Sequence, residues 1–321
     1  MALLLSRTDV ERLLTPQVCI GAVEDAFRQL ALGGVPAPGI LGLHHGEGGF
    51  HVKAGFLAVD GRTYFAAKLN ANFPGNPQRG LPTIQGAVIL SDAQDGRPLA
   101  IMDSISITAL RTAAASGVAA KYLAAKECDT ALIVGCGAQA SAQLHALMAV
   151  RHPRRVLAYD QDGKKAAAFA ARTGTMATSD LAAAVAASRI VITCTTARRY
   201  LIAREMVQPG TFIAAVGADN EDKQEIDPRL MAVSKVVTDL TDQACKIGDL
   251  HHAVEAGAMS RDDVYAELSE VVAGRKPGRT GAEEIFVFDS TGTGLQDVAA
   301  AIAVYRRAVD GKEGHEFDIG G

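Results

Sequence analysis

The stretch that decides the fold is Gly135-Cys136-Gly137-Ala138-Gln139-Ala140, which directly follows the apolar run 131–134. A short apolar run of this kind is typical of a buried parallel strand, and the residues after the turn are typical of a helix. Gly135 permits a tight turn, Gly137 leaves the backbone open to close approach, and Ala140 fills a third position that needs a small residue. The stretch therefore predicts a strand-turn-helix unit whose helix N-terminus can receive a pyrophosphate.

An acidic residue follows at the spacing that a bound dinucleotide requires. The next apolar run, 156–159, ends at Asp160, about 20 residues beyond the glycine turn. A carboxylate here accepts hydrogen bonds from the adenosine ribose and repels a 2′-phosphate, and no arginine follows it immediately. NAD is therefore the predicted cofactor, with NADH preferred and NADPH as a second option. The alternative is that Asp160 only caps a turn.

Two kinds of pattern surround this unit. Strand-like runs alternate with helical stretches over 131–288, which predicts a doubly wound parallel sheet; the runs are 131–134, 156–159, 190–194, 211–216, 235–239 and 285–288. Earlier in the chain, Ser6 and Thr8 signal a first helix, and residues 16–31 predict a second. The stretch 36–103 contains strand-like runs at 50–56, 64–69 and 83–91 separated by turns, as in an antiparallel sheet. A last helix over about 295–309 is expected to return to this first module.

These patterns predict an α/β protein in which a Rossmann domain is inserted into a discontinuous α+β domain. The expected boundaries assign residues 1–115 and 298–321 to the discontinuous domain and residues 116–297 to the Rossmann domain. Residues 104–123 predict a long helix at the first boundary. Its small residues at 113–117 permit the close approach of another backbone.

Composition excludes several classes of function. A formal net charge of -4 offers no basic field for nucleic acid. No apolar segment approaches the roughly 20 residues of a membrane span, and the first residues lack the basic start of a signal peptide. We therefore expect a soluble, cytoplasmic protein that binds neither nucleic acid nor membrane. The five cysteines form no Cys-x-x-Cys pair and the eight histidines lack metal-site spacing, so we expect reduced thiols and no metal.

Five pieces of the sequence resemble the ornithine cyclodeaminase and mu-crystallin family. In order and spacing they cover nearly the whole chain. The family includes ornithine cyclodeaminase, archaeal-type alanine dehydrogenase and reductases of cyclic ketimines such as Δ1-pyrroline-2-carboxylate. The pieces are Lys68-Leu69-Asn70-Ala71-Asn72-Phe73-Pro74-Gly75-Asn76-Pro77 with Gly80-Leu81-Pro82-Thr83, Ala109-Leu110-Arg111-Thr112-Ala113-Ala114, Gly135-Cys136-Gly137-Ala138-Gln139, Gly217-Ala218-Asp219 with Lys223-Gln224-Glu225, and Phe288-Asp289-Ser290-Thr291-Gly292 with Gln296-Asp297.

The resemblance implies a homodimer formed through the discontinuous domain, which would also bind the substrate. It implies that Lys68 and Arg111 lie at the substrate and the nicotinamide, and that Asp219 is the acid/base, with Lys68 counted beside it as catalytic. The expected cofactor-binding residues, which include the two turn glycines, are Thr83, Arg111, Gly135, Gly137, Ala138, Gln139, Asp160, Thr195, Gly217 and Ser290.

The chemistry of the three key residues supports these roles independently. An amino-acid-like substrate carries a carboxylate, which calls for a positioned cation, and Lys68 lies in an otherwise apolar run. Arg111 lies between an apolar residue and small ones, where a buried guanidinium needs an anion. Asp219 follows a predicted strand at the carboxyl edge of a parallel sheet, where ligands bind. The alternatives are a strand-edge lysine, a structural ion pair and a turn cap, respectively.

The stretch 36–55 departs from the family pattern. Many members have a cation shortly after a proline in the first strand, whereas this chain reads Pro36-Ala37-Pro38-Gly39-Ile40-Leu41. Lys53, together with His51, is the predicted substitute anchor for the substrate carboxylate. A solvated lysine is the alternative at this position.

The predicted reaction is hydride transfer between the nicotinamide and the α-carbon of a small amino or imino acid. The preferred interpretation is an NAD(P)H-dependent reductase of a small cyclic imino acid, of the Δ1-pyrroline-2-carboxylate or ketimine type, or a closely related amino-acid dehydrogenase. One alternative is ornithine cyclodeaminase, which forms proline and ammonia with no net redox change. Another is a non-catalytic, mu-crystallin-like protein that binds NAD(P)H.

Overall fold

The structure is a computed structural model that describes residues 1–319. Contacts divide the chain into two compact units: unit 1 comprises Met1–Arg111 and Thr293–Gly321, and unit 2 comprises Thr112–Gly292. Unit 1 is therefore discontinuous. Both boundaries lie a few residues before the predicted ones, because the helix Ser104–Leu123 crosses the first boundary and the final helix belongs to unit 1 from its first turn.

Unit 1 is built on a seven-stranded sheet with the order β17-β1-β6-β5-β4-β3-β2. All neighbouring strands are antiparallel except β1 and β6, whose parallel pairing corrects the expectation of a purely antiparallel module. The predicted runs lie within or overlap β3, β4 and β5, whereas the shorter strands carry too little alternation to be recognised. The strands are β1 (Ala2–Leu5), β2 (Gly39–His45), β3 (Gly48–Val59), β4 (Arg62–Asn72), β5 (Ile84–Asp92), β6 (Pro98–Asp103) and β17 (His315–Phe317).

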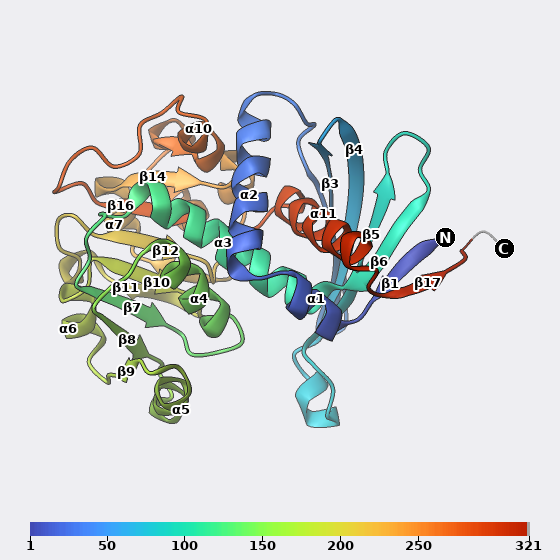
Figure 1. Cartoon of the computed structure of the whole chain (residues 1–321). Helices are drawn as coiled ribbons and strands as arrows, with labels where there is room; N and C mark the ends of the chain where they lie inside the picture. Colours follow the sequence, from blue (N-terminus) through green and yellow to red (C-terminus); the bar gives the residue numbers. More distant parts are fainter. Residues whose placement is uncertain (320–321) are drawn as a thin grey trace. The chain divides into compact units, whose positions relative to one another are not determined.

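Three α-helices lie wholly within unit 1: α1 (Arg7–Leu13), α2 (Pro16–Ala31) and α11 (Gly294–Gly311). Ser6 caps α1 through a capping box, and Thr15 caps α2. α2 ends where Gly33 takes a positive φ. α11 packs against α2, β3 and β4, as Figure 1 shows, which confirms that the last helix returns to the first module.

The two faces of the unit 1 sheet differ in character. Side chains alternate along β4, so that Ala66 and Lys68 are buried while Leu69 is 46% exposed. Cross-strand partners share a face, and Lys53 on β3 stands opposite Lys68 while Val52 stands opposite Leu69. The face with Lys68 is the one that α11 contacts, and the opposite face presents apolar side chains to solvent.

Unit 2 is built on an eight-stranded sheet with the order β15-β14-β16-β12-β10-β7-β8-β9, in which every neighbouring pair is parallel. All six predicted strands are present, which confirms the doubly wound α/β class. The strands are β7 (Thr130–Val134), β8 (Arg155–Tyr159), β9 (Met176–Ala177), β10 (Ile190–Thr193), β12 (Phe212–Ala215), β14 (Lys235–Thr238), β15 (Ala266–Glu267) and β16 (Phe286–Asp289); β11 (Arg198–Ile202) and β13 (Gln224–Ile226) form a separate pair.

The strand order of unit 2 identifies where a ligand binds. From β7 the chain adds β8 and β9 on one side, and β10 and β12 then follow on the other, so the order reverses between β7 and β10. Ligands of such sheets bind at the carboxyl ends of the strands beside this reversal. The helices of unit 2 are the end of α3 (Ser104–Leu123), then α4 (Ala140–Val150), α5 (Gly163–Thr173), α6 (Leu181–Ala186), α7 (Pro228–Val233), α8 (Thr241–Ala244), α9 (Asp249–Glu255) and α10 (Leu268–Val272).

Within residues 1–319, no helix is both long enough and apolar enough to cross a lipid bilayer.

Two glycines of unit 1 test how tightly α11 packs. A Cβ atom on Gly294 would lie 2.5 Å from the carbonyl oxygen of Ala54 on β3, whereas a Cβ atom on Gly21 inside α2 would meet nothing within 4 Å. We expect Gly294→Ala to lower the free energy of unfolding by about 1–3 kcal/mol, because rigid backbone must move. The control Gly21→Ala should raise it by about 0.5–1 kcal/mol, because alanine loses less entropy in a helix. Urea unfolding measures both; equal shifts would contradict the packing argument.

Candidate functional site

The glycine turn of unit 2 follows β7 at the strand-order reversal. Gly135 has a φ of +93°, and a Cβ atom there would lie 2.9 Å from both the Cys194 carbonyl oxygen and Thr195 Cγ2. Gly135 is therefore required by both conformation and packing. Gly137 differs, because a Cβ atom there would meet nothing within 4 Å. The open space at Gly137, directly before α4, is a cradle into which a pyrophosphate fits.

Asp160 lies at the end of β8 and organises this turn. Its Oδ2 accepts a hydrogen bond from the Cys136 backbone N–H at 2.8 Å, and its Oδ1 accepts one from the Asp162 N–H at 2.9 Å. The turn-capping alternative is thus realised in the structure. Each carboxylate oxygen has a second lone pair, so the same side chain can also accept from ribose hydroxyls.

A cleft of about 720 Å³ opens at these strand ends. It contains four of the predicted cofactor-binding residues, together with two cations, Lys165 and Arg199, that sequence reasoning missed. Neither cation belongs to a recognisable motif: Lys165 lies on α5 and Arg199 on β11, and only the folded chain brings both to the cleft. The lining residues are Val134, Gly135, Gly137, Tyr159, Asp160, Gln161, Asp162, Lys165, Leu181, Cys194, Thr195, Thr196, Ala197, Arg199 and Leu201.

Other predicted cofactor residues lie near the same edge of the sheet. Ala138 and Gln139 stand at the start of α4, Gly217 follows β12, and Ser290 follows β16. The Oε1 of Gln139 and the Oγ of Ser290 are buried with no hydrogen-bond partner among residues 1–319. Buried polar atoms are almost always satisfied, so these two atoms are suited to a polar ligand. Together with the open space at Gly137, they fit a bound dinucleotide.

Asp219 lies in the loop between β12 and β13. Its side chain is 58% exposed, and its Oδ1 accepts a hydrogen bond from Lys223 Nζ at 2.7 Å. Its backbone N–H donates to the carbonyl oxygen of Gly217. The carboxylate is therefore accessible at the carboxyl edge of the sheet, where a ligand can reach it, and the structure gives it one cationic neighbour.

Unit 1 contains a buried cluster of two cations and one anion. Asp297 Oδ1 accepts from Lys68 Nζ at 2.8 Å and from Arg111 Nε at 3.0 Å, and Gln296 Oε1 accepts from Arg111 Nη1 at 2.8 Å. Lys68, Arg111 and Asp297 are 3%, 5% and 1% exposed. Because β4 lies between β3 and β5, the strand-edge alternative for Lys68 is wrong. Arg111 has the anionic partner that its burial requires.

Burial and neighbouring charges shift the pKa values of Lys68 and Asp297 in this cluster. Burial and the neighbouring Arg111 charge lower the pKa of the Lys68 ammonium to about 7, although Asp297 opposes the shift. Burial raises the pKa of Asp297, but Lys68 and Arg111 outweigh burial and hold it below its ordinary value. The second oxygen of Asp297 and the amide nitrogen of Gln296 are buried with no hydrogen-bond partner within residues 1–319. The cluster thus offers polar groups to a small ligand.

The β3 residues predicted to assist substrate binding share a sheet face with Lys68. Lys53 stands opposite Lys68, and His51 stands opposite Asn70. The charge of Lys53 acts on both Lys68 and Asp297, lowering both pKa values. Thr83 lies elsewhere in unit 1, at the base of the 73–83 loop, where its carbonyl oxygen accepts from the Phe73 N–H.

Asp297 is the residue of this cluster that sequence reasoning did not assign. The motif Gln296-Asp297 counted toward the family resemblance but received no role. A signal existed, because an acid directly before the apolar run 298–304 falls on a helix whose surroundings are apolar. Such an acid is almost never buried without a cation, and two buried cations were already predicted.

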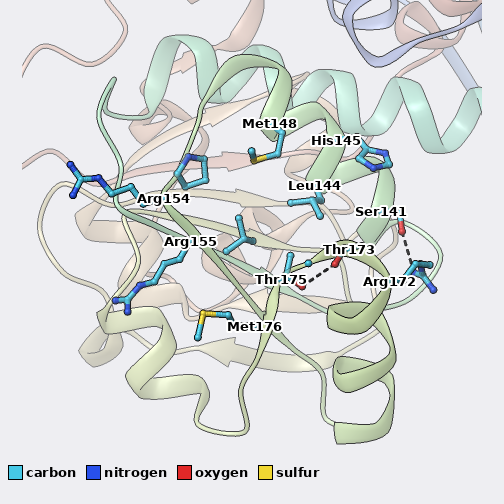
Figure 2. A pocket seen from close by; sticks show the side chains of 13 residues that line it. Ser141, Leu144, His145, Met148, Arg154, Arg155, Arg172, Thr173, Thr175 and Met176 are labelled. Atoms are coloured by element: carbon cyan, nitrogen blue, oxygen red, sulfur yellow. Dashed lines mark hydrogen bonds between the residues drawn. The ribbon is translucent and has the colours of Figure 1, made fainter.

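A second cleft of unit 2, of about 610 Å³, contains none of the predicted site residues. Figure 2 shows Arg154 and Arg155 at one end and Arg172 at the other, with Leu144 and Met176 between them. Each arginine already has a partner within unit 2, namely Asp129, Thr130 and Ser141 respectively. Of these partners only Asp129 is an anion, so Arg154 has an ion pair, whereas Arg155 and Arg172 donate to neutral hydroxyls.

Within residues 1–319, one group of metal-ligand type occurs, on α9. His251, His252 and Glu255 bring one ligand atom each within 4.8 Å of one another. A ring nitrogen of each histidine already lies at hydrogen-bond distance from a carbonyl oxygen, His251 Nδ1 at Cys245 and His252 Nε2 at Lys223. The sequence spacing did not suggest this group.

Comparison with known proteins shows the same pattern along the whole chain. The model of the ornithine cyclodeaminase/mu-crystallin family matches residues 1–312. The structure is similar to an archaeal alanine dehydrogenase dimer with bound NAD, at 38% identity and a TM-score of 0.93, covering 99% of both chains. It is also similar to the Δ1-pyrroline-2-carboxylate reductase of Thermococcus litoralis in complex with NADH and L-proline, at 34% identity and a TM-score of 0.91, covering 98% of this chain and 100% of that one.

A third solved structure is the iminosuccinate reductase of Paracoccus denitrificans in complex with NAD+, at 33% identity and a TM-score of 0.92, covering 99% of both chains. These three relatives differ in the amino or imino acid in their names. They agree in a nicotinamide cofactor and in near-complete coverage of the chain.

Proposed function

The chain belongs to the ornithine cyclodeaminase/mu-crystallin family and is an oxidoreductase, and we propose that it reduces the C=N bond of a small imino acid with NADH. The preferred substrates are cyclic imino acids of the Δ1-pyrroline-2-carboxylate or ketimine type, or the imine form of a small amino acid. The observation that carries the proposal is the buried Lys68–Arg111–Asp297 cluster, which suits a small carboxylate, in a chain that also has a dinucleotide turn.

We assign the cofactor to unit 2. The α4 N-terminus and Gly137 would receive the pyrophosphate, Asp160 would accept from the ribose, and Gln139, Thr195, Gly217 and Ser290 would line the remainder. When bound, NADH supplies the hydride. A carboxylate at Asp160 disfavours a 2′-phosphate, which supports a preference for NADH over NADPH, although Lys165 and Arg199 line the same cleft.

We assign the substrate carboxylate to the cations of unit 1. Lys68 and Arg111 each share Asp297, so neither charge is fully neutralised, and further N–H donors of both side chains can reach a ligand. Lys53 lies on the same sheet face. With His51, it would replace the cation that many family members have shortly after a proline and that the stretch 36–41 lacks. In this assignment unit 1 holds the substrate and unit 2 the cofactor.

We assign proton transfer to Asp219. Reduction of an imine needs a proton on the nitrogen, which makes the carbon electrophilic and leaves an amine as product. A carboxyl group in an accessible loop at the ligand-binding edge of a parallel sheet is suited to exchange that proton. Lys223, which is bonded to Asp219, would hold the carboxylate in place.

The proposal is tested by a panel of substrates. We expect the purified protein to consume NADH with Δ1-pyrroline-2-carboxylate, Δ1-piperideine-2-carboxylate or a keto acid plus ammonia, and to use NADPH less efficiently.

We expect Asp219→Ala to lower kcat by about 10²- to 10⁴-fold, the usual contribution of general acid/base help, without weakening NADH binding. Absorbance of NADH measures turnover, and NADH fluorescence measures binding.

Each alternative gives a distinct result in the same panel. Ammonia release from ornithine without net NADH change would replace the reductase by a cyclodeaminase. Binding of NADH without turnover of any substrate would point to a non-catalytic binding protein. Full activity of Asp219→Ala would remove that residue from the mechanism.

The pKa of Lys68 gives a prediction about pH. Only the ammonium form attracts a substrate carboxylate, and with a pKa of about 7 its charged fraction falls as the pH rises through neutrality. We therefore expect kcat/KM for the substrate to decline above about pH 7. In Lys68→Arg the guanidinium stays charged over this whole pH range, so this decline should disappear. Identical pH profiles of the two proteins would contradict the assignment of Lys68 to the substrate.

We further propose that the chain forms a homodimer through the exposed face of the unit 1 sheet. Large exposed apolar surfaces mark interaction sites, and the archaeal alanine dehydrogenase to which this chain is similar is a dimer. Strand register places the exposed side chains on one face: Leu41 and Leu43 on β2, Phe50 and Phe56 on β3, Leu69 on β4 and Ile89 on β5.

The dimer is tested by Leu69→Glu, which places a charge in the middle of this face. We expect wild type to have twice the chain mass in light scattering and Leu69→Glu to be a monomer, because burying an unpaired carboxylate is costly. The control Leu32→Glu alters an exposed leucine at the end of α2 and should stay dimeric. A monomeric wild type, or a dimeric Leu69→Glu, would exclude this interface.

A further inference from the structure

Glu225 is a fully buried carboxylate among the loops that follow β10 and β12. Its Oε2 accepts from Thr193 Oγ1 at 2.6 Å and from the Gly217 N–H at 2.7 Å, and its Oε1 accepts from the Thr195 N–H at 2.7 Å. All three partners are donors, which matches an ionised carboxylate because that group only accepts. Since β10 and β12 are adjacent parallel strands, one side chain joins the two loops that leave them.

The first consequence concerns the loop that carries Asp219. A Cβ atom on Gly217 would lie 2.6 Å from Glu225 Cδ and 2.3 Å from the Thr195 carbonyl oxygen. Glycine is therefore required at 217 by the contact with Glu225 and Thr195. The segment 217–225 begins at a residue whose N–H donates to the Glu225 side chain and ends at Glu225 on β13, so this carboxylate closes the loop on which Asp219 lies.

The second consequence concerns the dinucleotide turn. Thr195, whose N–H is held by Glu225, would have its Cγ2 2.9 Å from a Cβ atom on Gly135, and Cys194 Sγ lies 3.2 Å from the Gly135 carbonyl oxygen. The turn is thus packed directly against the segment 194–195. A shift of that segment would displace the backbone that is assigned to the pyrophosphate.

Glu225 is itself held firmly. Its backbone N–H and that of Ile226 both donate to Asp249 Oδ1, at 2.7 and 2.8 Å. The N–H of Leu250 at the start of α9 donates in turn to Asp289 Oδ2 at 2.8 Å. A chain of buried carboxylates therefore connects β13, α9 and the end of β16, which leaves the Glu225 side chain little freedom to move.

We infer that Glu225 is a positioning residue of the reaction, whose carboxylate sets the Asp219 loop and holds the Thr195 segment against the dinucleotide turn. Its burial means that it acts through the groups it holds. The inference rests on the proposed function, because Asp219 and the turn are the parts of the site that it orders.

The test compares the same substitution at two places in unit 2. Glu225→Gln keeps the shape, but an amide has a single acceptor oxygen, and its NH₂ group must face an N–H or O–H donor. We expect kcat to fall about 10- to 100-fold, since small displacements of reacting groups cost rates of this size. The fluorescence-measured Kd for NADH should rise by about tenfold, one hydrogen-bond-sized loss of free energy.

The matched control is Glu284→Gln. Glu284 accepts from Lys235 Nζ and from the Thr280 and Gly281 N–H groups, but it lies before β16, at the opposite end of the same sheet. Glu284→Gln should lower the free energy of unfolding, while kcat and KM per folded molecule stay unchanged. If Glu225→Gln behaves like this control, keeping kcat and the Kd for NADH within about twofold of wild type, the positioning role is wrong.

A double variant separates this inference from the proposed function. In an Asp219→Ala background, Glu225→Gln should lower kcat far less than it does in wild type, because residues that act together are not additive. If the two substitutions multiply in full, Glu225 does not act through Asp219. If Asp219→Ala alone is fully active, the acid/base assignment fails, whereas weaker NADH binding in Glu225→Gln still supports the role at the turn.

Amide exchange provides a readout that does not depend on a folded variant. If Glu225→Gln does not fold, exchange in wild type still decides. The Thr195 and Gly217 N–H groups lie in loops, yet both should be protected like the amides of β10 and β12, because the buried carboxylate accepts from them. Rapid exchange at both positions would overturn the inference.

Discussion

The carboxylate of Asp297 is the interaction on which unit 1 depends. It accepts hydrogen bonds from Lys68 and Arg111, which lie 229 and 186 residues earlier in the chain. Two buried cations without this anion would carry a large desolvation cost, and a buried acid without them would protonate. The cluster therefore joins β4, α3 and α11, and it explains how a unit interrupted by 181 residues, from Thr112 to Gly292, is completed by its last helix.

Buried carboxylates also organise the carboxyl edge of the unit 2 sheet. Asp239 accepts from Thr291 and Gly292, Asp289 from the start of α9, and Asp249 from β13. Loops at the end of a parallel strand leave backbone N–H groups without ladder partners, and acidic side chains satisfy them. The edge that binds ligands in this class of sheet is thus held in place by acidic side chains that accept hydrogen bonds from its loops.

The elements with a strong local signal were predictable. α2 and the helix 104–123 match their predicted spans, and the glycine turn lies where its spacing indicated. The short strands β1, β2, β6 and β17 were not, because three to seven residues carry little periodicity and their pairing comes from distant segments. Lys68 and Arg111 were recognisable as charges in apolar surroundings, whereas Glu225 counted only toward the family resemblance and received no role.

The sequence by itself determined the class of fold, the position of the dinucleotide turn and the two cations that need an anionic partner. These features depend on local spacing and on the cost of burying charge. Only the tertiary structure decided that Asp297 is the anion, that Lys53 stands opposite Lys68, and that Gly217 is a glycine because Glu225 lies against it. Each of these contacts joins residues from different elements. Strand register and helix packing create them, and neither is written in any one stretch of the chain.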